Sequence, residues 1–115
     1  MQVKWEKNSP PNGVNGKDVN LEALLVEAYR DNGSVKHRLI ERLGTIEEKF
    51  LASRVRNMRE FHQGLFWVIV DKKLDRLRLT PSLRSRVEAD ISQTVSRPGE
   101  DWALWGVTCI PRFDP

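Results

Sequence analysis

The chain has a single cysteine, Cys109, among its 115 residues. An intramolecular disulfide needs two thiols and an iron–sulfur or zinc cluster needs several, so one cysteine excludes all of these. Cys109 lies in the apolar stretch WGVTCIP, far in sequence from both histidines. We therefore expect a buried, inert thiol in a reducing compartment rather than a nucleophile.

Long apolar runs are also missing. The longest, Leu65 to Val70, is far shorter than the about 18 residues that span a bilayer. The N-terminal letters MQVKWEKNSPPNGVNGK contain no apolar signal-peptide core, so we expect an intracellular, cytoplasmic protein without membrane contact. The length suits one domain, and the composition divides it into a flexible or irregular lead-in over residues 1–20 and a single domain over residues 21–115. Alternating Val3 and Trp5 leave open a short edge strand inside the lead-in.

Catalytic and metal-binding patterns are absent as well. The sequence has no H-x-x-x-H, C-x-x-C or H-E-x-x-H spacing and no glycine-rich phosphate loop. His62 lies beside an apolar helical stripe, where a histidine is more often a packing residue than a ligand or a base. The sequence therefore predicts no enzyme, no metal site and no cofactor.

The clearest positive signal is a β-hairpin in LLVEAYRDNGSVKHRLIERLG. Asn32-Gly33 between two strand-like runs is typical of a two-residue type I′ turn, in which both central residues take φ > 0. This turn sets the register, which is Asp31 with Ser34, Arg30 with Val35, Tyr29 with Lys36, Ala28 with His37, Glu27 with Arg38, Val26 with Leu39 and Leu25 with Ile40.

This register divides the hairpin into two faces. We expect the first to be the core side, and it carries Leu24, Val26, Ala28, Val35, His37 and Leu39. The second face presents a tyrosine between cations, and it carries Leu25, Glu27, Tyr29, Lys36, Arg38 and Ile40. Glu27 and Arg38 form an opposite-charge cross-strand pair on it. An ordinary solvated sheet face is the alternative interpretation of this second set.

Two helices are predicted after the hairpin. Thr45-Ile46-Glu47-Glu48 matches a capping box, so the first helix should begin at Ile46. It should continue to Arg78 or Leu79, with a kink allowed at Gly64, although Leu65 to Val70 is also compatible with a strand. Thr80-Pro81 predicts the start of a second helix, whose apolar positions end before Pro98. A last strand or packed tail covers residues 102–110, with Trp102 and Trp105 as core anchors.

These elements give an α+β fold. It consists of an N-terminal antiparallel hairpin, a long helix, a second helix and a short C-terminal strand or tail, and the strands precede the helices instead of alternating with them. No internal repeat is visible.

The net charge is only +3, but the cations are unevenly distributed. Residues 45–79 hold eight Lys and Arg residues against five Asp and Glu residues. A local cation excess suits a polyanionic partner, although mixed charges also keep an ordinary exposed helix soluble. The candidate nucleic-acid-binding residues are therefore Tyr29, Lys36 and Arg38 on the hairpin and Arg54, Arg56 and Arg59 on the helix.

The stretch EAYRDNGSVKHRLIERLGTIEE, with Tyr29, Arg30, Asn32-Gly33, Lys36, Arg38 and Leu43-Gly44, resembles the N-terminal segment of bacterial insertion-sequence DDE transposases. The resemblance covers about 25 of the 115 residues. The remainder, FWVIVDKKLDRLRLTPSLRSRVEADISQTVSRP, looks like small uncharacterised bacterial proteins that pair the same hairpin with two helices. The catalytic carboxylate domain has no counterpart, so the resemblance implies an accessory or DNA-binding role linked to mobile elements, without transposase activity.

The sequence thus favours a small non-enzymatic nucleic-acid-binding protein, with DNA preferred over RNA as the partner. A protein-interaction or homodimeric module, which pairs its hairpin edge or its tryptophans with a second chain, is the alternative. The position of the tryptophans and of the free strand edge distinguishes the two hypotheses.

Overall fold

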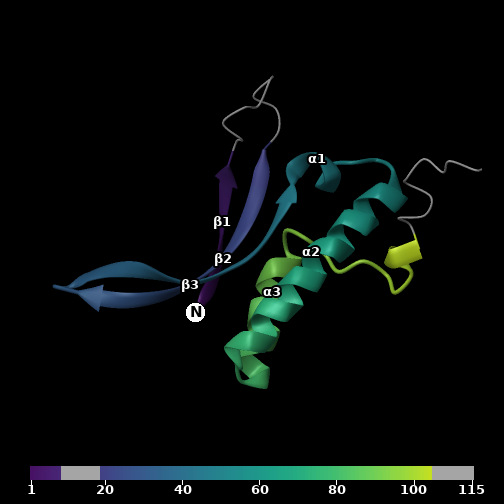
Figure 1. Cartoon of the computed structure of the whole chain (residues 1–115). Coiled ribbons are helices and arrows are strands. Elements are labelled where there is room, and N and C mark those ends of the chain that lie inside the picture. The colour runs from purple at the N-terminus through teal and green to yellow at the C-terminus, as the bar shows by residue number, and fades with distance from the viewer. Residues whose placement is uncertain (9–18, 105–115) are drawn as a thin grey trace, which may run out of the picture.

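The computed structural model describes residues 1–8 and 19–104, and it is an α+β structure with a sheet followed by helices (Figure 1). This confirms the predicted fold class. The elements in chain order are β1 (Gln2–Asn8), β2 (Asn20–Asp31), β3 (Ser34–Glu47), α1 (Glu48–Leu51), α2 (Arg56–Leu77) and α3 (Pro81–Ser92). Among the described residues, no helix has the length and apolar character needed to cross a membrane.

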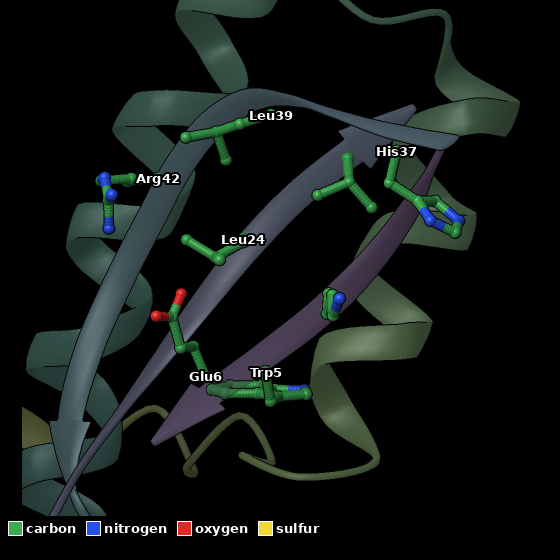
Figure 2. Close-up of a pocket in the computed structure, with 8 residues that line it drawn as sticks. Trp5, Glu6, Leu24, His37, Leu39 and Arg42 are labelled. Atoms are coloured by element: carbon green, nitrogen blue, oxygen red, sulfur yellow. The ribbon is translucent and has the colours of Figure 1, made fainter. Parts of the chain in front are cut away.

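The sheet is antiparallel, with strand order β1-β2-β3. The alternation of Val3 and Trp5 allowed a short edge strand near the N-terminus, and β1 is this strand. It pairs with β2 from Gln2↔Val26 to Asn8↔Asn20. The helices pack against one face of the sheet, where Phe66, Val70 and Leu74 of α2 share a core cluster with Leu25 and Leu43. No helix of the described residues lies on the other face (Figure 2).

The turn and most of the predicted register are confirmed. Asn32 and Gly33 have φ of 50° and 83°, as a type I′ turn requires, and the pairs from Asp31↔Ser34 to Val26↔Leu39 are those predicted. The prediction is wrong for Leu25, which pairs with Glu41 instead of Ile40. Register shifts occur at Leu25/Val26 and at Ala23/Leu24, so β3 accommodates an extra residue at each place and bends.

The predicted core face of the hairpin is also wrong. The core cluster contains Leu21, Ala23 and Leu25, which alternate with the predicted set, and Ile40 packs against it. Leu24 and Val26 are buried on the opposite side of the sheet, whereas Val35 and Leu39 are exposed. Both faces of β2 are apolar between residues 23 and 26, so alternation could not show which face the helices would cover.

The capping-box prediction fails at the junction between sheet and helix. Thr45 and Ile46 are still in β3, paired with Glu22 and Leu21, and Ile46 belongs to the core. The short helix α1 begins only at Glu48 and has no side-chain cap, and the long helix α2 begins separately at Arg56. Strand pairing in the sheet therefore overrides a local helix-start signal.

The ambiguous segment 65–70 is helical. α2 runs without a break through Gly64 as far as Leu77, and Arg78 ends it in the left-handed region with φ of 50°. Thr80 caps α3 as predicted, since its side chain accepts a hydrogen bond from the backbone N–H of Leu83 at 3.3 Å. α3 ends at Ser92, earlier than the predicted limit before Pro98, and Val95 beyond its end is fully buried.

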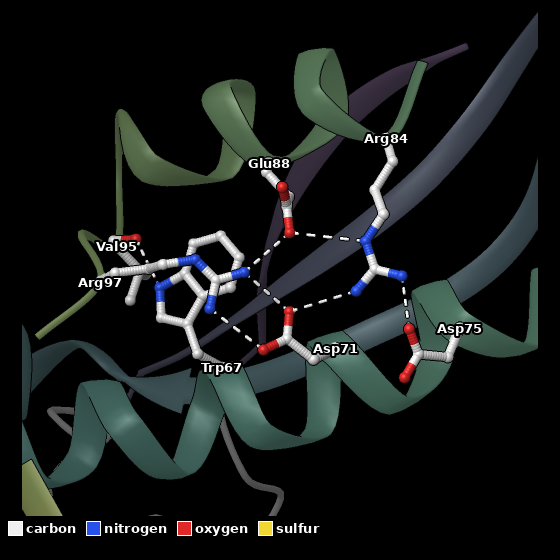
Figure 3. Close-up of polar contacts among 7 residues, drawn as sticks. All are labelled: Trp67, Asp71, Asp75, Arg84, Glu88, Val95 and Arg97. Carbon is white, nitrogen blue, oxygen red and sulfur yellow. Dashed lines mark hydrogen bonds and ion pairs between the residues drawn. The ribbon is translucent and has the colours of Figure 1, made fainter. Parts of the chain in front are cut away.

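A charged network fastens α3 to α2 (Figure 3). Arg97 donates to Asp71 at 2.7 and 3.0 Å and to Glu88 at 2.8 Å, and its guanidinium lies 3.9 Å above the Trp67 ring. The Trp67 indole N–H in turn donates to the Val95 carbonyl at 3.0 Å. The hydrogen bond with Asp71 raises the pKa of Arg97 above its ordinary value.

Arg84 extends the same network. It hydrogen-bonds to Asp75, with ion pairs to Asp71 at 3.7 Å and to Glu88 at 3.5 Å, and the bond with Asp75 raises its pKa. Because Arg84 and Arg97 are matched by three carboxylates, they act as structural cations rather than as a free basic surface.

The C-terminal prediction is covered only in part by the described residues. Trp102 is half-buried and lies 6.2 Å, between ring centroids, from Phe61 of α2. Residues 102–104 form a helical turn instead of a strand. Trp105 and the rest of the predicted strand or tail lie outside the described residues.

Candidate nucleic-acid interface

A two-stranded ribbon, formed by residues 27–38, projects from the sheet (Figure 1). It exists because β1 pairs with β2 only as far as Val26, so that β2 and β3 continue with no third strand from the described part of the chain. All residues from 28 to 38 are exposed. A ribbon without a core of its own leaves the side chains of both faces available to a partner.

The first ribbon face brings together the three candidate residues predicted on the hairpin. Arg38 donates to Glu27 at 2.9 Å, and its guanidinium carbon lies 5.6 Å from the centre of the Tyr29 ring. Lys36 lies opposite Tyr29 in the register and pairs with Asp31 at 3.1 Å. Tyr29, Lys36 and Arg38 therefore form one continuous polar surface.

The second ribbon face contains a cation that the sequence reasoning did not select. Arg30 lies opposite Val35, and the next pair along this face is Ala28 with His37. The ring of His37 is 3.1 Å from the Gln2 side-chain amide, so β1 meets the base of the ribbon here. The predicted register already placed Arg30 at the tip. Because this face was assigned to the core, Arg30 was not chosen as a DNA-binding candidate.

The charges of the ribbon leave a small positive excess. Arg30, Lys36 and Arg38 stand against Glu27 and Asp31, which gives three positive and two negative charges, or +1. Side chains in the two ion pairs are 40% to 61% exposed. Exposed pairs contribute about 0–1 kcal/mol, so a phosphate can replace either carboxylate at little cost.

The helix cations lie elsewhere. Arg54 is exposed between α1 and α2, Arg56 pairs with Glu60 at 3.3 Å, and Arg59 donates to the Ser53 carbonyl at 3.0 Å. The start of α2 and the ribbon tip lie at opposite ends of the molecule (Figure 1). The structure therefore does not join the two predicted groups into one patch.

The helix-free face of the sheet contains a shallow cavity of about 430 Å³. Leu24, Val26 and Leu39 form its apolar part, and Lys4 and Arg42 lie among its lining residues. Figure 2 shows Leu24, Leu39 and Arg42 in front of the strands, with the helices behind them. The Arg42 guanidinium is 2.5 Å from Glu22, so it is partly neutralised. This face continues into the second ribbon face through His37.

A third surface is an apolar groove of about 230 Å³ beside α2. His62 stacks on Phe50 there, with ring centroids 3.5 Å apart and planes 11° apart, and burial lowers the pKa of the imidazole. This packing role agrees with the prediction for His62. Leu65, Val68 and Ile69 are exposed on the same helix. In the part of the chain that the structure describes, no group of three or more His, Cys, Asp or Glu residues is arranged to hold a metal ion.

Residues 12–64 match the family model described as IS1634 family transposase, N-terminal domain. No curated protein and no solved structure matches the chain. The matched segment contains the hairpin and extends into α2, so it confirms and lengthens the resemblance seen in the sequence. The match links this part of the chain to the proteins of mobile genetic elements.

Proposed function

We propose, from the similarity of residues 12–64 to a transposase N-terminal domain, that the chain is a small cytoplasmic DNA-binding protein of a mobile element without enzymatic activity. The ribbon is its DNA-contacting part. A transposase acts on DNA, so similarity to the N-terminal domain of one supports a DNA-binding role for this part of the chain.

The observation that carries this proposal is the shape of the ribbon. The major groove of B-DNA is about 12 Å wide and admits either a helix or a two-stranded β-ribbon. Residues 27–38 form such a ribbon, with no described strand beside it and with every residue from 28 to 38 exposed. The ribbon can therefore enter the groove without rearrangement of the sheet.

The side chains of the ribbon supply the contacts that such a position needs. Lys36, Arg38 and Arg30 reach toward phosphates, which dominate protein–DNA affinity, and Tyr29 can donate its hydroxyl to the backbone or stack. Arg38 and Arg30 are on opposite faces, so they address both walls of a groove. The deep, narrow major groove of A-form RNA excludes an element of this size, which favours duplex DNA over duplex RNA.

The cations near the start of α2 have a smaller part in this proposal. Arg59 supports the backbone of Ser53 and Arg56 is paired with Glu60, so Arg54 is the more available of the three. Their distance from the ribbon means that they contact DNA only if the duplex bends around the molecule or a second duplex binds.

The test is a fluorescence anisotropy titration of the full chain with a labelled duplex at low salt. Arg38→Gln should raise Kd about threefold to tenfold, whereas Glu27→Gln should lower it because it frees Arg38. Arg86→Gln is the matched control, since it removes an exposed cation from α3, and it should leave Kd almost unchanged. Equal effects of Arg38→Gln and Arg86→Gln would overturn the ribbon as the contact site.

The second candidate function is a protein-interaction module. It draws support from the exposed Leu65, Val68 and Ile69 on α2, which lie three and four residues apart on one helix face. Among the described tryptophans, Trp67 is 2% exposed, and Trp5 and Trp102 are half-buried, so the apolar surface rests on aliphatic side chains. If the protein does not bind DNA at micromolar concentration, the protein-interaction module becomes the favoured function.

A further inference from the structure

The two edges of the sheet differ in how they are protected. β3 has two register shifts, and such irregularity discourages pairing with another chain. β1 pairs with β2 in an unbroken register over all seven of its residues, and its other side has no strand neighbour in the described sheet. β1 also contacts α3, and it is a regular edge with no strand bound to its outer side among the described residues.

We propose that this edge binds a second copy of the same chain. Two β1 strands would pair antiparallel about a two-fold axis through Trp5, joining two three-stranded sheets into one of six strands. In this register Lys4 lies opposite Glu6 of the second copy, and Glu6 lies opposite its Lys4. The inference does not depend on DNA binding and concerns another surface of the molecule.

The charges of β1 select this register. Lys4 and Glu6 are both exposed and are two residues apart, so they share the helix-free face. Centring the pairing on Lys4 or on Glu6 would place two like charges directly opposite each other. A shift of one residue would set Trp5 against a charge and would put the helices of the two copies on opposite faces of the sheet.

Among the described residues, neither charge has an ionic partner. Glu6 lies opposite Glu22, whose carboxylate already binds Arg42 at 2.5 Å, and Lys4 lies opposite the apolar Leu24. The ion pairs found among the described residues do not include Lys4 or Glu6. A second copy supplies the opposite charge to each of them at once.

The other side of β1 is compatible with the same arrangement. Trp5 is half-buried and stacks on Phe66 with ring centroids 5.9 Å apart, so it belongs to the layer between sheet and helices. At the two-fold axis it would meet Trp5 of the second copy, and aromatic pairs between neighbouring strands are favourable. The interface thus has one tryptophan pair on the side of the sheet that faces the helices and two Lys4–Glu6 ion pairs on the helix-free side.

The test is sedimentation velocity on the full chain with any tag at the C-terminus, so that β1 stays unmodified. A single strand edge is smaller than a standard interface, so we expect a dimer with Kd on the order of 10–100 µM. Lys4→Glu and Glu6→Lys should each weaken self-association about tenfold or more, because each turns two ion pairs into two repulsive pairs. Circular dichroism of each variant provides the folding control.

Two mixing experiments separate this register from a general charge effect. An equimolar mixture of the Lys4→Glu and Glu6→Lys proteins should form a heterodimer, because every cross-strand pair then joins opposite charges. The variant with both substitutions in one chain should recover the wild-type Kd. A wild-type protein that stays monomeric at about 300 µM overturns the proposal. Singly substituted proteins that dimerise as well as the wild type, or a mixture that fails to associate, also overturn it.

The outcome does not depend on the proposed function. Lys4 and Glu6 lie outside the ribbon, so a wild-type protein that binds DNA but stays monomeric rejects only the β1 interface. Ribbon variants that dimerise and bind DNA as well as the wild type reject only the ribbon as the DNA contact.

Discussion

Glycine is needed at position 64, in the middle of α2, because the indole of Trp102 occupies the space that a larger side chain would take. A Cβ at position 64 would lie 2.6 Å from Cε2 of Trp102 and closer still to Cδ2 and Cε3. Alanine is about 1 kcal/mol better than glycine inside a helix, whereas forcing atoms into a filled space costs about 1–3 kcal/mol. Gly64→Ala should therefore destabilise the wild-type protein by about 1 kcal/mol.

The sign of this effect should reverse when the indole is removed. In a Trp102→Ala background only the helix propensity remains, so Gly64→Ala should stabilise the protein by about 1 kcal/mol. The coupling between the two positions is then about 2 kcal/mol. Urea denaturation followed by far-UV circular dichroism measures all four proteins under the same conditions. Substitution effects that agree within about 0.5 kcal/mol in the two backgrounds would refute the packing of Trp102 on Gly64.

Three further predictions follow from the turn, the helix caps and His62. Gly33→Val should weaken the ribbon by about 1 kcal/mol or more, because Gly33 has φ of 83°, and faster amide exchange in residues 27–38 would show this. Thr80→Ala should cost about 1 kcal/mol in urea denaturation, whereas Thr45→Ala, which removes no cap, should show no coupling to Glu48→Ala. Burial lowers the pKa of His62 from 6.5. The nearby Lys49 also lowers this pKa and Glu47 raises it, and the net effect is that the folded state favours the neutral ring. Stability should therefore fall as the pH drops through about 6.5, and the melting temperature of His62→Phe should depend less on pH over that range.

Local chemistry determined the parts of the fold that the sequence predicted well. The Asn32-Gly33 turn and the Thr80-Pro81 helix start depend on nearest neighbours, and both are found as expected. The helical character of residues 65–70 followed from a 3.6-residue pattern that continued into polar sequence on the C-terminal side. In each case the deciding interactions lie within a few residues.

Long-range packing determined what the sequence did not show. The Thr45 capping box was overridden because Thr45 and Ile46 complete the pairing of β3 with β2. The core face of the hairpin was inverted because the position of α2, and not the alternation in β2, decides which apolar face is covered. The separation in space of the two groups of candidate cations depends on where β3 ends and α2 begins.

Arg30 illustrates the same point within the candidate site. The predicted register placed Arg30 at the ribbon tip, but on the face that the sequence analysis wrongly assigned to the core. A ribbon that extends beyond its neighbouring strand has no core side, and that feature depends on where β1 ends.

The salt dependence of DNA binding tests the central claim most directly. Each phosphate contact on duplex DNA contributes a slope of about −0.9 to log K against log salt. The wild-type slope should exceed that of the Arg30→Gln/Lys36→Gln/Arg38→Gln variant by about 1 to 3 in magnitude, because the variant loses up to three ribbon contacts. A wild-type protein that does not bind duplex DNA at micromolar concentration and low salt would contradict the account, and so would equal slopes for the two proteins.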